Sequence, residues 1–161
     1  MPGLAPSSVA RSHVGCVRKR NEDRVLDRPQ AALWAVADGM GGHAGGAAAA
    51  ARVIDSLSAV THGVSGPAFL IDISSALQAA NRALHADAAS PCGATIVALF
   101  IHEGHHVCLW AGDSRAYRLR DGALLRLSRD HSVVQDMVDR NMLSEAERNH
   151  HPRRKIGRAH V

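Results

Sequence analysis

The chain has 161 residues, of which 46% are hydrophobic and 21% are charged. This composition is that of a globular protein and excludes a disordered, collagenous or coiled-coil chain. The length suffices for one compact domain or part of one, but not for two ordinary domains.

Charge and hydropathy exclude two classes of partner. Basic residues outnumber acidic ones by 19 to 15, but much of the excess lies between Arg148 and Arg158, and aromatic residues make up only 3% of the chain. Nucleic-acid-binding proteins usually combine a basic surface with aromatic stacking platforms, so we expect no nucleic acid. Because no apolar run reaches the length of a membrane span and the first residues lack the pattern of a secretory signal, we expect a cytoplasmic protein without membrane contact.

The first half of the chain predicts one strand and two helices. Residues 33–38 form a short apolar run that ends in an acid and enters a glycine-rich stretch, as a buried strand does before a turn. Residues 47–57 are rich in alanine and carry larger apolar residues on one side, which predicts a helix. Residues 67–88 repeat apolar residues at steps of three and four and predict a second helix.

The second half of the chain predicts antiparallel strands and a short helix at 131–140. Asp121-Gly122 is a strong signal for a two-residue hairpin turn. Helices followed by a run of strands, without regular alternation, predict an α+β fold. The predicted strands contain β-branched, aromatic or alternating residues and cover 93–101, 106–112, 115–120 and 123–128.

The three cysteines are an odd number at wide spacing, which fits neither a disulfide framework nor a zinc site. We expect reduced thiols in the core. They are Cys16, Cys92 and Cys108.

Acidic residues stand at three predicted strand ends: Glu22 with Asp23, Asp38 and Asp113. A carboxylate in such a place is costly unless it is solvated, paired or bound to a cation. Convergence on hard metal ions explains all three places together, and a ligand set made only of oxygen favours Mg²⁺ or Mn²⁺. Gly39 can turn its carbonyl toward an ion that Asp38 holds.

Four short motifs surround these acids. They are R-x-x-N-E-D at 18–23, D-G-M-G-G-H at 38–43, G-A-T at 93–95 and A-G-D-S-R at 111–115. In this order they resemble the motifs of the PPM-type (protein phosphatase 2C) metal-dependent Ser/Thr protein phosphatases, in particular the bacterial branch, over residues 9–152. The resemblance implies an αββα sandwich of two antiparallel sheets flanked by helices.

The resemblance also implies a binuclear Mn²⁺ or Mg²⁺ centre whose bridging hydroxide hydrolyses phosphoserine or phosphothreonine. In that centre Asp38 would bridge both ions and Gly39 would offer its carbonyl. Glu22 and Asp23 would hold the second ion, and Asp113 would hold a third, weaker ion.

Two further residues acquire catalytic roles through the resemblance. Arg18 would clamp the substrate phosphate with its planar guanidinium, and His43 would donate a proton to the leaving alkoxide. The implied partners are proteins phosphorylated on Ser or Thr, the substrates of a bacterial Ser/Thr kinase.

Five of these residues also have a structural explanation. Glu22 and Asp23 can belong to a solvated turn paired with a neighbouring arginine, and Asp38 can cap the helix that follows. Asp113 can form an Asx turn with the serine after it, and His43 can be a passive turn residue.

Two other functions fit parts of the sequence. Gly39, Gly41 and Ala44 meet the relaxed dinucleotide fingerprint, but Asp38 would then face a pyrophosphate and no second parallel strand with a terminal acid follows. The other is a noncatalytic phosphopeptide-binding pseudophosphatase or regulatory module.

The chain departs from the family pattern at its C-terminal side. The pattern continues with S-D-G-L and D-N aspartates that bind metal, and neither occurs here. We therefore expect a disordered N-terminus over 1–8 and the first two-thirds of a catalytic domain over 9–155, incomplete and weakly active or inactive. The final residues 156–161, IGRAHV, are compatible with a translated sequencing adapter and predict a non-native tail.

Overall fold

The computed structural model describes residues 6–41, 45–61, 63–86, 92–148 and 150–151. None of the helices in these ranges is long and apolar enough to cross a membrane. In chain order the elements are β1 (Asp23–Arg28), a 3₁₀ turn (Pro29–Ala31), β2 (Leu33–Met40), α1 (Gly45–Ser58), α2 (Gly66–Ala86), β3 (Gly93–Ala94), β4 (Ile96–His102), β5 (His105–Ala111), β6 (Tyr117–Arg120), β7 (Ala123–Arg126), α3 (Val133–Asp139) and α4 (Glu145–Arg148).

The strands form two antiparallel sheets, which confirms the predicted α+β class. The larger sheet has the order β1-β2-β4-β5, and β3 also pairs with β2. The smaller sheet is the β6–β7 hairpin. Its turn is the predicted Asp121-Gly122 pair, and both residues have positive φ, as a tight two-residue hairpin requires.

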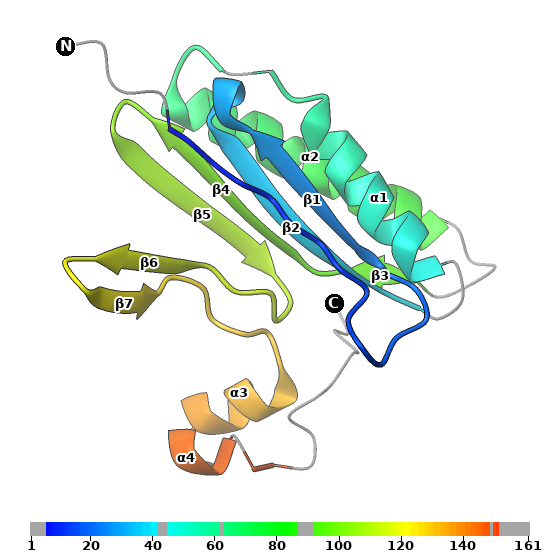
Figure 1. Ribbon diagram of the computed structural model, residues 1–161, viewed down its shortest axis with the longest axis vertical. Coiled ribbons are helices and arrows are strands. Elements are labelled where there is room, and N and C mark those ends of the chain that lie inside the picture. Colours follow the sequence, from blue (N-terminus) through cyan, green and yellow to red (C-terminus); the bar gives the residue numbers. More distant parts are fainter. Residues whose placement is uncertain (1–5, 42–44, 62, 87–91, 149, 152–161) are drawn as a thin grey trace.

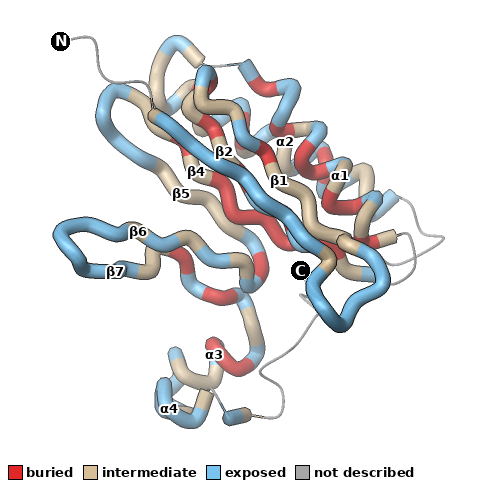
Figure 2. The backbone as a smooth tube through the Cα atoms, in the orientation of Figure 1, coloured by how far each residue is buried: buried red, intermediate tan, exposed pale blue. Residues whose placement is uncertain are grey.

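Helices α1 and α2 cover one face of the larger sheet (Figure 1). Alternate residues of β2 point into this core, and Leu33, Ala35 and Ala37 are buried. Phe69 of α2 meets Phe100 of β4 edge to face, with ring centroids 5.0 Å apart. The tube in Figure 2 shows this buried band running along β2, β4 and the inner side of α1. The apolar periodicity therefore located both helices correctly.

Three details differ from the sequence predictions. For β1 the sequence predicted only a strand end at Glu22 and Asp23 and no range, because β1 is an edge strand in which charged residues interrupt the apolar ones. The strand predicted over 93–101 is interrupted at Thr95, between β3 and β4. All three cysteines are free thiols, but Cys16 is exposed rather than in the core, and the other two are half-buried.

Candidate metal centre

Strands β1 and β2 bring two of the predicted ligands side by side. The Cα atoms of Asp23 and Asp38 are direct partners in the antiparallel ladder. Residues opposite each other in such a ladder point to the same face of the sheet, with Cβ atoms about 5 Å apart. Ala37 and Gly39, which flank Asp38, are buried on the side of α1. The two carboxylates therefore project from the face that the helices do not cover.

Three acids, Glu22, Asp23 and Asp113, gather around Asp38. Partial burial raises the pKa of its carboxyl group, and the negative charges of Asp23 and Asp113 raise it further. Hydrogen bonding with the Asp23 side chain and the charge of Glu22 act in the same direction. Like charges disfavour ionisation, so a cation placed among these groups would offset their repulsion.

The glycines around residue 40 allow α1 to lie directly against this acidic end of the sheet. A Cβ on Gly39 would lie 2.0 Å from the carbonyl oxygen of Gly46, and a Cβ on Gly46 would lie 2.7 Å from Oε2 of Glu22.

Gly39 pairs with Ala94 in an antiparallel sheet. The dinucleotide fingerprint requires a parallel βαβ unit, so this alternative is wrong.

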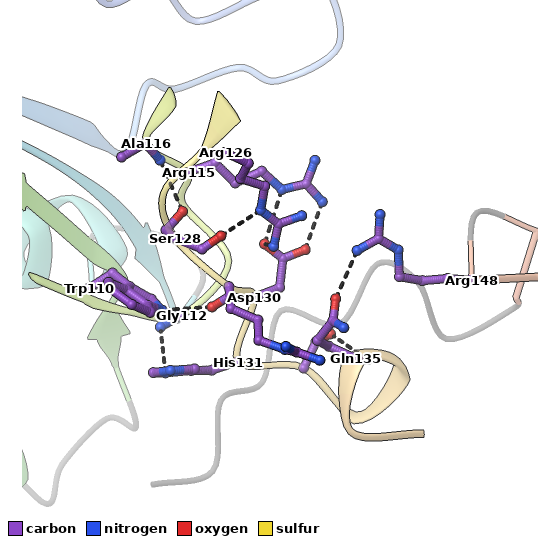
Figure 3. A network of polar contacts seen from close by, with 12 residues as sticks. Trp110, Gly112, Arg115, Ala116, Arg126, Ser128, Asp130, His131, Gln135 and Arg148 are labelled. Carbon is purple, nitrogen blue, oxygen red and sulfur yellow. Dashed lines mark hydrogen bonds and ion pairs between the residues drawn. The ribbon is translucent and has the colours of Figure 1, made fainter. Parts of the chain in front are cut away.

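Asp113 lies in the turn after β5. Hydrogen bonds join this turn to the segment before α3 (Figure 3). The main-chain N–H of His131 donates to the carbonyl of Gly112 at 2.9 Å, and the Gly112 N–H donates to Nδ1 of His131 at 3.4 Å. Arg115 donates from Nε and Nη2 to the two oxygens of Asp130 at 3.0 and 2.7 Å. The turn is therefore anchored on both sides of Asp113.

Asp130 is the centre of this anchor. Its burial raises the carboxyl pKa, but hydrogen bonds and charge from Arg115, with the charges of Arg126 and Arg148, outweigh burial and lower the pKa below its ordinary value. Asp130 is 9% exposed. A buried carboxylate with two arginine partners stabilises the fold only while it is ionised.

The two predicted catalytic residues have different outcomes. Arg18 is exposed, in the segment that precedes β1. Its contact with a substrate phosphate stays a prediction. His43 lies outside the described residues, as do residues 1–5 and the predicted tail 156–161.

The donor set fits a hard divalent cation, although the cage is incomplete. Within the described ranges no three His, Cys, Asp or Glu side chains form a group that could hold a metal ion. Glu22, Asp23 and Asp113 are thus close enough to raise the pKa of Asp38 without forming a full ligand shell with it. Carboxylates with a nearby main-chain carbonyl are the ligands that Mg²⁺ and Mn²⁺ prefer.

Two residues in this region, Thr95 and Asp130, make contacts that the sequence did not predict. Thr95 hydrogen-bonds both to the backbone of Asp38 and to the side chain of Ser114. Asp130 forms ion pairs with two arginines, Arg115 and Arg126. The G-A-T motif marked Thr95 as part of a pattern, but its partners Asp38 and Ser114 lie 57 and 19 positions away in the chain. Of the two arginines, Arg126 is only four positions from Asp130, whereas Arg115 is 15 positions away.

A separate cavity of about 630 Å³ lies between α2 and the ends of β3 and β5. Its lining includes Met40, Leu77, Leu84 and Trp110, and none of the four acids borders it. The predicted metal ligands therefore lie outside this cavity.

Comparison with known proteins identifies relatives of this arrangement. The family model described as protein phosphatase 2C matches residues 12–159. The serine/threonine protein phosphatase PstP of Mycobacterium tuberculosis strain H37Rv is 36% identical over 152 residues, a match that covers 91% of this chain and 29% of PstP. A crystal structure of PstP from M. tuberculosis superimposes with a TM-score of 0.84 at 34% identity, covering 92% of this chain and 65% of that chain.

Two further structures are similar. PppA of Pseudomonas aeruginosa is 44% identical with a TM-score of 0.76, over 89% of this chain and 60% of that chain. The catalytic domain of PstP in complex with two manganese ions is 35% identical with a TM-score of 0.76, over 85% of this chain and 61% of that chain. The chain thus spans less than two thirds of these solved chains. Because the family model matches nearly its whole length and the gathered acids stand in the family's motifs, this chain belongs to the protein phosphatase 2C family.

Proposed function

We propose that this chain carries much of the metal-binding part of a Ser/Thr protein phosphatase active site. Such a site hydrolyses phosphoserine and phosphothreonine with two Mn²⁺ or Mg²⁺ ions. The observation that carries the proposal is the direct pairing of Asp23 with Asp38, within the negative field of Glu22 and Asp113. The two manganese ions in the PstP complex support it.

The acids and one carbonyl would hold the metal. Asp38 would contact both ions, the Gly39 carbonyl one of them, Glu22 and Asp23 the second, and Asp113 a third ion. When bound, such ions lower the pKa of coordinated water and neutralise the charge of a phosphoryl group. The packing of Gly39 on Gly46 would keep that carbonyl in place.

Two further side chains would act on the substrate. Arg18 would bind the phosphate oxygens through two parallel N–H groups. His43 would deliver a proton to the leaving serine or threonine oxygen. The proposed substrates are phosphorylated proteins made by a Ser/Thr kinase, and a cytoplasmic location stays a prediction.

We propose further that this chain is incomplete and hydrolyses phosphoesters weakly or not at all without additional ligands. The S-D-G-L and D-N aspartates of the family pattern do not occur in it. The three carboxylates proposed for the two ions carry three negative charges against the four positive charges of two divalent cations.

The test joins this chain to the corresponding C-terminal part of the M. tuberculosis PstP catalytic domain and measures release of phosphate from a phosphothreonine peptide. We expect hydrolysis with Mn²⁺, and loss of hydrolysis with EDTA or in Asp38→Ala. The matched control is Asp55→Ala, which removes an exposed acid on α1 and should retain full activity. Hydrolysis that persists with EDTA or in Asp38→Ala would contradict the proposal.

A further inference from the structure

Thr95 lies between the two segments that carry Asp38 and Asp113. The pairings of β2 with β3 and with β4 share one register, and this register places Thr95 opposite Asp38. The register of β4 with β5 places Gly112 opposite Thr95 on the other side. Thr95 is therefore the residue of the central strand that separates one proposed ligand from the turn that holds another.

The hydroxyl of Thr95 replaces a ladder hydrogen bond. The Thr95 N–H donates to the carbonyl of Asp38 at 2.8 Å, as in a regular antiparallel pair. The Asp38 N–H, however, donates to Oγ1 of Thr95 at 3.1 Å. The same Oγ1 lies 2.6 Å from Oγ of Ser114, so one hydroxyl joins the backbone of Asp38 to the residue after Asp113.

The turn that holds Asp113 packs closely against Thr95. Thr95 is 4% exposed. Gly112 has φ of +102°, and a Cβ there would lie 2.6 Å from Cγ2 of Thr95. The two hydrogen bonds between Gly112 and His131 hold the turn from the opposite side. The position of Asp113 relative to Asp38 thus depends on the size and the hydrogen bonds of the Thr95 side chain.

We propose that Thr95 is a positioning residue that sets the spacing between Asp38 and Asp113 and thereby the affinity of this end of the sheet for divalent cations. The inference rests on the proposed function, because it requires that these acids bind metal. Residues that orient metal ligands without touching the ion typically change metal affinity about 10- to 100-fold when they are replaced.

The experiment uses Mn²⁺ alone as the probe and the whole chain as the protein. The thermal midpoint is measured in EDTA and over a series of Mn²⁺ concentrations, which gives an apparent Mn²⁺ affinity. We expect Thr95→Val, which keeps the shape and removes the hydroxyl, to weaken Mn²⁺ binding about tenfold or more. Thr95→Ser, which keeps the hydroxyl, should bind within about twofold of the parent chain.

Two further variants make the test decisive. Ser114→Ala removes only the second contact and should weaken Mn²⁺ binding about threefold or more, which keeps the test open if Thr95→Val does not fold. Thr61→Val makes the same replacement at an exposed position and should change nothing. The inference is overturned if Ser114→Ala binds Mn²⁺ with unchanged affinity. It is also overturned if Thr95→Val folds, binds Mn²⁺ with unchanged affinity and is equally destabilised with and without Mn²⁺. Either result leaves the proposed function standing. A parent chain that does not bind Mn²⁺ overturns the inference, whereas the proposed function fails only if the chain joined to the PstP part shows no Mn²⁺-dependent hydrolysis.

Discussion

The backbone of Gly39 lies so close to that of Gly46 that a methyl group on Gly39 would sit 2.0 Å from the Gly46 carbonyl oxygen. We expect Gly39→Ala to push the start of α1 off β2 and to lower the free energy of unfolding by at least about 2 kcal/mol. Urea denaturation measures this loss. Gly45→Ala is the control, since its new Cβ would meet only the Cβ of Cys92 at 3.2 Å. The free energy of unfolding of Gly45→Ala should stay within about 1 kcal/mol of that of the parent chain, because alanine favours a helix. Equal losses of stability in the two variants would contradict the close packing of Gly39 on Gly46.

Replacement of Asp38 by Asn should separate charge repulsion from metal binding. The neighbouring carboxylates disfavour the ionised form of Asp38, so Asp38→Asn relieves repulsion and should leave the thermal midpoint in EDTA unchanged or higher. The rise in midpoint on adding Mn²⁺ should disappear, because Asp38 is the proposed central ligand. Asp121→Asn, in the exposed β6–β7 turn, should behave as the parent chain. A Mn²⁺ response that survives in Asp38→Asn would show that the ion binds elsewhere.

The pH dependence of stability should report on Asp130. The pKa of this carboxyl group lies below its ordinary value of 3.8, so its ion pairs stabilise the fold at every pH above that value. The stabilisation is lost as the pH falls below 3.8 toward the lowered pKa. Asp130→Asn should cost about 2 kcal/mol at neutral pH and flatten the decline of stability in acid, as followed by urea unfolding at a series of pH values.

The control for that series is Asp139→Asn. The Asp139 carboxylate pairs with Arg129 at the surface, where both side chains are more than a third exposed. A solvated pair contributes little, so this variant should lose less stability than Asp130→Asn. Acid profiles of the same shape in the parent chain and Asp130→Asn would contradict the assignment.

The β6–β7 hairpin presents an apolar pair to solvent. Leu119 and Leu124 are cross-strand partners and are 70% and 67% exposed. Threonine has a high strand propensity, so the double replacement Leu119→Thr with Leu124→Thr should change the free energy of unfolding by less than about 0.5 kcal/mol. It should also reduce self-association in light scattering, because exposed apolar patches promote association. Leu33→Thr, at a fully buried position, should by contrast unfold the chain. A comparable loss of stability in the hairpin variant would show that Leu119 and Leu124 are covered.

Much of the local structure could be predicted because its cause lies within a few residues. The alanine-rich run that becomes α1 and the three- and four-residue apolar steps of α2 show a helical period directly. The Asp121-Gly122 turn needs only two residues that tolerate positive φ. The range of strand β1 escaped prediction because its stability comes from pairing with β2 rather than from its own pattern.

The sequence by itself determined the family, the helices, the hairpin and the set of acids, since motifs and short periods are contained in the order of residues. Only the tertiary structure decided that Asp23 pairs with Asp38 and that Thr95 joins Asp38 to Ser114. It alone also decided that Asp130 anchors Arg115. These contacts link residues 15 to 57 positions apart, and their geometry depends on strand register and core packing, which no local propensity specifies.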